Sequence, residues 1–241
     1  MTRITEIAPD VFQLTTFAPQ FDLQISQFLI RDDAPLLYHT GMRSLFPAVR
    51  EAVARLIDPA SLRFVGFSHF EPDECGALNE WLAVAPAAEP VCSVVGATVF
   101  IEDFANRTPR ALGSDDSLPL GRHTMRLIPT PHLPHGWDAS LMFDETSGVL
   151  FCSDLFHQIG DVEPMTSASV IERCRDALVA YQRGPLADYM PFRERTRSQI
   201  AELVQLQPRA CAPMHGSTFI GDGGQALLEL GTVLEEVLGE R

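Results

Sequence analysis

A dense group of metal-binding side-chain types directly follows a run of apolar residues. Residues 62–67 predict a buried strand, and His69, Glu71 and Asp73 then alternate along the chain, with Glu74 beside them. This spacing suits an irregular loop at the carboxyl end of a strand, with its side chains turned toward one point. A solvated acidic loop could carry the same carboxylates, so the motif alone leaves both a metal site and an exposed loop open.

Side chains of the same types recur further along the chain, each beyond the end of a predicted strand. This recurrence favours one shared site over a solvated loop, because convergent ligand-type residues on several strand ends are the usual construction of an active site. The residues are His132, His135, Asp154 and His215, and the strands that precede them are predicted at 122–128, 149–152 and 210–213.

The order of the predicted elements indicates a mixed α/β fold. Two blocks, each with its own alternation of strands and helices, favour a sandwich of two sheets covered by helices over a single doubly wound sheet. No Gly/Ser-rich or charged linker interrupts the chain, so we expect one domain, 1–241. The predicted strands are 22–31, 35–38, 62–67, 91–95, 122–128, 140–143, 149–152 and 210–213, and the predicted helices are 44–57, 75–85, 168–182, 193–205 and 224–238.

Charge and composition argue against several classes of partner. The formal net charge is −14, and no basic patch is visible. Such a surface repels nucleic acid and anionic membranes, so we expect neither as a partner. The N-terminal residues lack the apolar run of a signal peptide, and no stretch approaches the roughly 18 apolar residues that span a bilayer, so we expect a cytoplasmic protein. The oligomeric state is left open, with a homo-oligomer as one option.

The cysteines indicate no cross-linked scaffold. There are five of them, widely spaced and never in Cys-x-x-Cys form. We therefore predict neither a disulfide framework nor a structural zinc knuckle, and expect most of them to be small buried residues.

The ordered set His-x-Glu-x-Asp, then His, then Asp, then His resembles the metallo-β-lactamase superfamily, and specifically its flavodiiron branch. The hydrolytic branch has a second histidine where this chain has Glu71. Residues 135–140, 151–156 and 212–216 resemble the three later motifs of the diiron branch. The resemblance implies the metallo-β-lactamase-type αββα sandwich.

The resemblance also implies two metal ions and their ligands. Carboxylates are hard ligands that favour iron or manganese, and imidazole suits iron or zinc, so we expect iron, with zinc or manganese as alternatives. By the resemblance, one ion is held by His69, Glu71 and His135, the other by Asp73 and His215, and Asp154 bridges both.

The sequence leaves the roles of four further residues open. Glu74 stands where the family pattern has a histidine, so it binds as a carboxylate, stays outside the coordination sphere, or leaves the second ion short of a ligand. His39 replaces a usual aspartate, and is either a turn residue bonded to backbone or a residue that supports the metal site. His132 competes with His135, which we favour. His157 is either a proton donor near the site or an exposed loop residue, and we favour the latter.

The resemblance implies a centre that reacts with or reversibly binds O2 or NO. The family's reductases receive electrons from a fused flavodoxin-like domain, and this chain shows neither an FMN domain nor a rubredoxin-like cysteine pair. We therefore expect a separate electron-donor or signalling protein, and leave a reductase and an oxygen sensor open. The alternative is a zinc or mixed-metal hydrolase of esters, thioesters or phosphodiesters, which Glu71 and the acidic surface disfavour.

Overall fold

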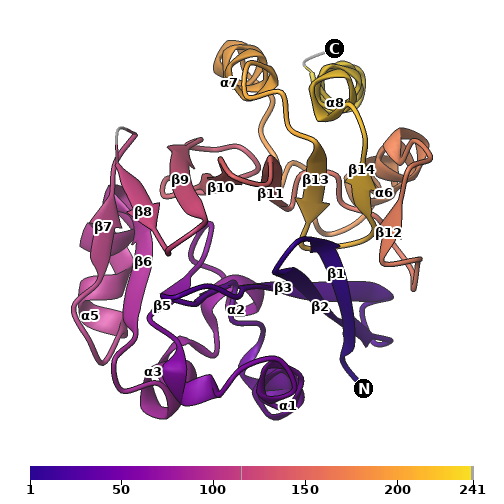
Figure 1. The fold of residues 1–241 in the computed structure, drawn as a ribbon. Helices are drawn as coiled ribbons and strands as arrows, with labels where there is room; N and C mark the ends of the chain where they lie inside the picture. Colours follow the sequence, from indigo (N-terminus) through magenta and orange to yellow (C-terminus); the bar gives the residue numbers. More distant parts are fainter. Residues whose placement is uncertain (115, 240–241) are drawn as a thin grey trace.

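Two β-sheets face one another in the computed structural model, and helices cover the outer face of each sheet (Figure 1). The structure describes residues 1–114 and 116–239. In Figure 1 helices α1 and α3 lie below the first sheet, and α6, α7 and α8 lie above the second. The predicted sandwich of two sheets covered by helices is confirmed.

The first sheet contains the N-terminal half of the chain. Its strands follow one another in sequence order, antiparallel from β1 to β4 and parallel from β4 to β7. The strands are β1 (Arg3–Ala8), β2 (Val11–Ala18), β3 (Leu23–Ile30), β4 (Leu36–Tyr38), β5 (Phe64–Gly66), β6 (Glu89–Ser93) and β7 (Arg110–Leu112).

The second sheet has the order β12-β14-β13-β11-β10-β9-β8. Strands β11 and β13 pair in parallel, as do β12 and β14, and the other pairs are antiparallel. The strands are β8 (Ser117–Pro119), β9 (Thr124–Pro129), β10 (Ser140–Asp144), β11 (Val149–Ser153), β12 (Met165–Thr166), β13 (Ala210–Pro213) and β14 (Thr218–Ile220).

The longest helices belong to the second half of the chain. They are α6 (Ile171–Gln182), α7 (Glu194–Val204) and α8 (Gly223–Leu238). The first half carries α1 (Phe46–Ala54), α2 (Pro72–Cys75), α3 (Leu78–Val84), α4 (Val94–Gly96), the π-helical turn η3 (Ala97–Ile101) and α5 (Glu102–Phe104), with 3-10 turns η1 (Arg43–Leu45) and η2 (Pro59–Ser61).

Three apolar layers hold the sandwich together. One, which includes Leu37 and Trp81, packs the first helices against the first sheet, and one, which includes Leu150, packs α6, α7 and α8 against the second sheet. The middle layer lies between the sheets and includes Phe28 and Phe151. Several strands are buried on both faces, and their sequences are therefore continuous apolar runs without polar/apolar alternation.

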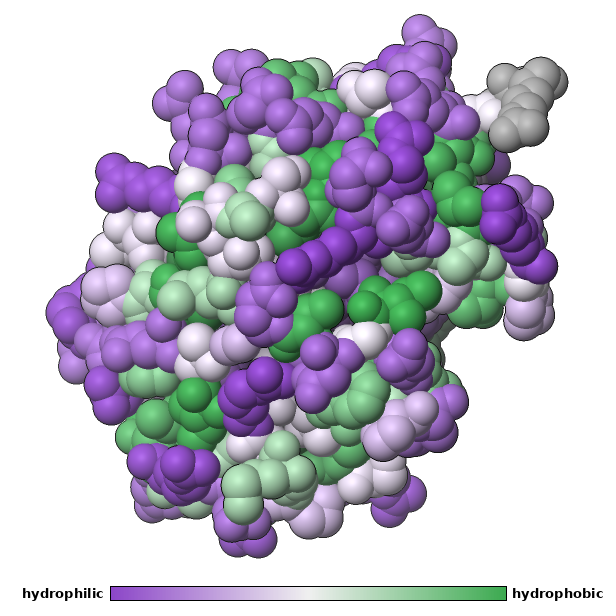
Figure 2. All heavy atoms as spheres, turned by 90° about the vertical axis from the view of Figure 1, so that its right-hand side faces the viewer, coloured by the Kyte–Doolittle hydropathy of each residue, from purple (hydrophilic) through white to green (hydrophobic). Residues whose placement is uncertain are grey.

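One face of the molecule can be judged by its hydropathy. Figure 2 shows the face on the right of Figure 1, where patches of hydrophobic residues interrupt a largely hydrophilic covering. Among the described residues no helix combines the length and apolarity that crossing a membrane requires. All five cysteines are buried and free, as predicted.

Several predicted boundaries need correction. The helix expected at residues 75–85 is two helices, α2 and α3, and the first begins earlier, at Pro72. The strand expected at 91–95 ends at Ser93, whose hydroxyl accepts the Gly96 N–H and caps α4. Strands β1 and β2 were not predicted, nor were the short strands β7, β8, β12 and β14. The hairpin of β10 and β11 and the strand β13 are confirmed.

We expect the middle layer to carry much of the stability. Phe151 is fully buried, with its ring centroid 5.0 Å from that of Phe28 and 5.7 Å from that of Tyr38. Phe151→Ala should lower the free energy of unfolding by about 3–5 kcal/mol, because it removes these contacts and leaves a cavity. Phe21→Ala, at a side chain 55% exposed, is the matched control and should change it by less than about 0.5 kcal/mol. Equal effects in urea unfolding would contradict this assignment.

Candidate metal centre

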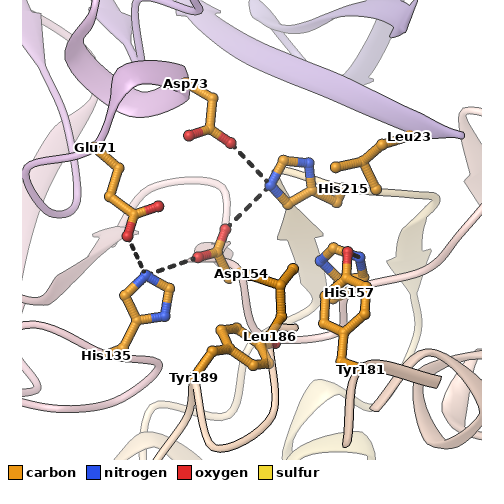
Figure 3. A pocket seen from close by; sticks show the side chains of 10 residues that line it. All are labelled: Leu23, Glu71, Asp73, His135, Asp154, His157, Tyr181, Leu186, Tyr189 and His215. Carbon is orange, nitrogen blue, oxygen red and sulfur yellow. Dashed lines mark hydrogen bonds and ion pairs between the residues drawn. The ribbon is translucent and has the colours of Figure 1, made fainter. Parts of the chain in front are cut away.

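All six predicted ligands meet at one place, in the loops and helix that follow strand ends. His69 and Glu71 lie in the loop between β5 and α2, and Asp73 lies within α2. The loop from β9 to β10 supplies His135, and the ends of β11 and β13 supply the remaining two, Asp154 and His215. Figure 3 shows five of the six side chains pointing toward one another from these segments.

Strand pairing explains why two of the ligands are neighbours. Strands β11 and β13 are adjacent and parallel, with Ser153 opposite Pro213. Their carboxyl ends therefore lie side by side, and the residues that follow them emerge at the same edge. Asp154 Oδ1 consequently lies 3.2 Å from His215 Nε2.

One group of ligands gathers on one oxygen of Asp154. Asp154 Oδ2 lies 3.6 Å from the Nε2 atoms of both His69 and His135. His135 Nε2 is also 3.0 Å from Glu71 Oε1, and His69 Nε2 is 3.9 Å from Glu71 Oε2. These side chains form one face of the site.

A second group gathers on the other oxygen. His215 Nε2 lies between Asp154 Oδ1 and Asp73 Oδ2, 3.2 Å from the first and 3.3 Å from the second (Figure 3). The Nδ1 atom of His215 is 2.7 Å from the backbone oxygen of Gln24, which orients the ring. Asp154 thus faces both groups, with one oxygen toward each.

The loops that carry the first group are tied together. Asp138, which is buried, accepts the Phe70 N–H through Oδ2 at 2.8 Å and so links the His69 loop to the His135 loop. His132 has a φ of 66°, and its N–H bonds the oxygen of Gly136 at 2.7 Å. His132 therefore shapes the loop that presents His135.

Glu74 lies inside the cluster rather than outside it. Its side chain is fully buried, and Oε1 is 3.6 Å from His69 Nε2. Burial raises the pKa of its carboxyl well above the usual value, and the nearby charges of Asp154, Asp73 and Glu71 raise it further. Glu74 is therefore the fourth carboxyl group of the cluster and the most buried one, while Glu71 is the most exposed.

The donor set fits bound cations. Neither oxygen of Glu74, nor Nε2 of His69, has a hydrogen-bond partner among the described residues. Buried polar atoms are normally paired, and a cation satisfies carboxylates and imidazole nitrogens together. Groups His69–His135–Asp154 and His69–Glu71–Glu74 each place ligand atoms within 4.8 Å of one another, as a metal site requires.

Charge within the cluster shifts its histidines in different directions. Burial acts to lower the pKa of His215, but Asp154 and Asp73 outweigh it and raise the pKa to about 10. Burial also acts to lower the pKa of His135, and Glu71 together with Asp154 raises it. For His69 burial prevails over the neighbouring carboxylates, and its pKa is lowered.

His157 corrects an expectation. It is not an exposed loop residue but a buried one, with Nε2 2.7 Å from the hydroxyl of Tyr181. Its ring centroid is 4.9 Å from that of His215, and burial lowers its pKa to about 3. His39 is also buried, and it bonds the Ser68 hydroxyl at 3.1 Å rather than backbone.

A pocket of about 250 Å³ opens onto the cluster. Besides ligand-type residues and His157, its walls include Leu23, Tyr181, Leu186 and Tyr189 (Figure 3). Tyr181 lies within α6 and Tyr189 follows it. These wall residues were not predicted, because single tyrosine and leucine residues carry no signal of a site in the sequence.

The fold and the site together define a metallo-β-lactamase-type domain. Residues 23–216 match the family model described as "ODP family beta lactamase". This match covers most of the chain, and the chain belongs to that family.

Known proteins agree with this assignment. The putative diflavin flavoprotein A 1 of Nostoc sp. strain PCC 7120 is 32% identical over 54% of this chain and 23% of its own length. The flavo-diiron protein FprA2 of Clostridium acetobutylicum is 23% identical over 56% of the chain and 34% of its own length. The chain therefore spans about a quarter to a third of these relatives.

Solved structures share the fold. Rubredoxin oxygen:oxidoreductase from Desulfovibrio gigas superimposes with a TM-score of 0.80 at 17% identity, over 95% of this chain and 61% of that one. A fragment, residues 1–254, of putative diflavin flavoprotein A 5 from Nostoc sp. PCC 7120 gives 0.79 at 18% identity and covers 98% and 97%. The predicted αββα fold is confirmed.

The positions of His132 and His135 lead to a prediction. His135→Ala should lower the metal content of the protein, because it removes an imidazole beside Glu71 and Asp154. His132→Asn is the matched control and should retain the metal, since asparagine tolerates the left-handed backbone at this position. Elemental analysis of both purified variants distinguishes them, and metal loss in His132→Asn alone would reverse the assignment.

Proposed function

We propose that this chain is a diiron domain that binds or reacts with O2 or NO. His69, Glu71 and His135 would hold one ion, Asp73 and His215 the other, and Asp154 would bridge them. The observation that carries the proposal is the position of Asp154, whose two oxygens face the two ligand groups separately. A carboxylate placed in this way is suited to hold two cations close together.

The chemistry of the ligands favours iron. Imidazole nitrogens and carboxylate oxygens occur together in the set, and no cysteine belongs to it. Such a mixture suits iron or manganese, whereas typical zinc sites are rich in sulfur or nitrogen ligands. When bound, a diiron pair supplies open coordination positions for a diatomic ligand and electrons for its reduction.

The protein's own residues would set access and polarity. Leu23 and Leu186 line the pocket beside the ligand cluster, so its wall is partly apolar (Figure 3). Among the described residues no lysine or arginine lines it. This wall suits a small uncharged ligand, and it offers nothing to neutralise a phosphodiester. The hydrolase alternative therefore gains no support from the pocket.

A hydrogen bond and aromatic packing would keep the wall in place. The bond between Tyr181 and His157 holds both side chains beside His215. The ring of Tyr189 packs 5.4 Å from that of His135 and 5.4 Å from that of Tyr181, measured between centroids. Together these aromatic residues would exclude bulk water from one side of the centre.

Electron delivery is a separate part of the proposal. Relatives are named flavo-diiron and diflavin flavoproteins, and this chain matches only part of their length. We propose that residues 1–241 act as one domain in the cytoplasm and receive electrons from, or signal to, a separate protein. A homo-oligomer is compatible with this arrangement.

The first test is metal loading under anaerobic conditions with iron supplied. We expect close to two iron ions per chain, and a change in the absorption spectrum when O2 or NO is added to the ferrous protein. A protein that carries two zinc ions although iron is abundant would contradict the assignment of iron. Iron-loaded protein whose spectrum responds to neither gas would contradict the proposed binding of O2 or NO.

The second test compares carboxylates that differ in position. Asp154→Asn should cause the largest loss of metal, because it removes charge from the group that faces both ions. Glu74→Gln should cause a smaller loss, since Glu74 approaches one ligand-type histidine, His69, whereas Asp154 approaches His69, His135 and His215. Asp103→Asn, at an exposed residue, is the control. Iron content of all three decides the order, and a loss in Glu74→Gln exceeding that in Asp154→Asn would overturn the bridging role.

A further inference from the structure

A group of buried hydroxyls lies behind His69, on the side away from the carboxylates. Ser68 Oγ is 3.1 Å from His69 Nδ1, and Ser153 Oγ is 3.3 Å from the same atom. The two hydroxyls are 2.8 Å apart, and His39 Nε2 lies 3.1 Å from Ser68 Oγ. All four residues are at least 98% buried, so these side chains interact with one another rather than with bulk water.

The proton on His69 has a defined place in this group. An imidazole that binds a metal through Nε2 carries its proton on Nδ1, so Nδ1 is a hydrogen-bond donor. Only the oxygens of Ser68 and Ser153 lie within hydrogen-bond distance of it among the described residues. They therefore accept this hydrogen bond, and both acceptors are uncharged.

The tautomer of His39 can be assigned from its second ring nitrogen, Nδ1. His39 Nδ1 is buried and has no partner among the described residues. A buried N–H without a partner is rarer in proteins than an unpaired acceptor, which favours the tautomer with the proton on Nε2. His39 then donates a hydrogen bond to Ser68 Oγ, and the Ser68 hydroxyl donates one to Ser153 Oγ.

Backbone conformation at both ends of the group is unusual. His39 has a φ of 65° and Ser153 a φ of 53°, in the left-handed region that residues with a Cβ rarely adopt. Such conformations persist only where the surrounding structure over-determines them, and they cluster at functional sites. Here they bring the imidazole of one strand end and the hydroxyl of another to the same serine.

The other ligand histidines are held differently. His215 Nδ1 lies 2.7 Å from a backbone oxygen, that of Gln24, and His135 Nδ1 has no partner among the described residues. His69 is thus the ligand whose orientation depends on side chains that substitution can remove one at a time.

We propose that Ser68, Ser153 and His39 form a neutral hydroxyl relay that fixes the tautomer and orientation of His69. The relay residues are positioning residues, because they act on the metal only through His69. This inference rests on the proposed function, since it requires a metal ion at His69 Nε2. Uncharged acceptors leave the imidazole less electron-rich than a carboxylate would, so the relay holds the ligand in place without adding negative charge to a cluster that already has four carboxylates.

The test is an anaerobic titration with Fe²⁺ in the presence of a competing chelator. Ser68→Ala and Ser153→Gly each remove one hydroxyl, and glycine accepts the positive φ at position 153. Each should weaken Fe²⁺ binding by about 10–100-fold, the usual effect of losing a group that orients a ligand. Ser68→Thr keeps a hydroxyl and should bind nearly as tightly as wild type. Ser26→Ala is the control, a fully buried serine bonded to Gln13 instead.

A second readout separates positioning from general loss of structure. In the Fe²⁺ protein, the exchangeable Nδ1 proton of His69 should give a shifted proton NMR signal that persists in D2O, because the relay is buried. In Ser68→Ala and Ser153→Gly this signal should exchange rapidly or vanish, while circular dichroism stays as in wild type.

Two results would overturn the relay. One is wild-type affinity together with a persistent signal in both folded variants, and the other is an equal loss of affinity in Ser26→Ala. A wild-type protein that binds no Fe²⁺ at all would instead overturn the proposed function, so the two failures can be told apart.

Discussion

Four carboxylates in one largely buried cluster are the constraint around which this structure is organised. Glu71, Asp73, Glu74 and Asp154 would repel one another strongly in a medium of low dielectric constant if all were ionised without a partner. Three histidine nitrogens are arranged between them, but His69 Nε2 and the Glu74 oxygens still lack hydrogen-bond partners among the described residues. Bound cations would remove the repulsion and supply the missing partners together.

The fold meets this constraint by drawing ligands from both sheets. The first half of the chain supplies the His69 loop and α2, and the second half supplies the ends of β11 and β13 and the loop before β10. His69, Asp154 and His215 each lie just beyond the end of a buried strand, so the sheet fixes their backbone, whereas α2 carries Asp73 and a loop carries His135. Asp138 joins two of the loops through the Phe70 N–H.

Much of the site was predictable because strand ends are readable in sequence. An apolar run followed by a ligand-type residue indicates both the strand and its exit, and this holds for His69, Asp154 and His215. The burial of His157 was not predictable, because it depends on the packing of Tyr181 from a helix further along the chain. The break after α2 was missed as well. There the Ala77 N–H bonds the Gly41 oxygen and the Thr40 hydroxyl, which are tertiary contacts that a helical pattern does not reveal.

The apolar layer between the sheets has a consequence for the order of assembly. Phe28, Phe151 and their neighbours hold the two sheets together without help from any ligand residue. The sandwich could therefore form first, and any ions would then enter the pocket that Leu23 and Leu186 help to line. In that case the identity of the metal would depend on which ions are available to the folded protein, and not on which ion helped it to fold.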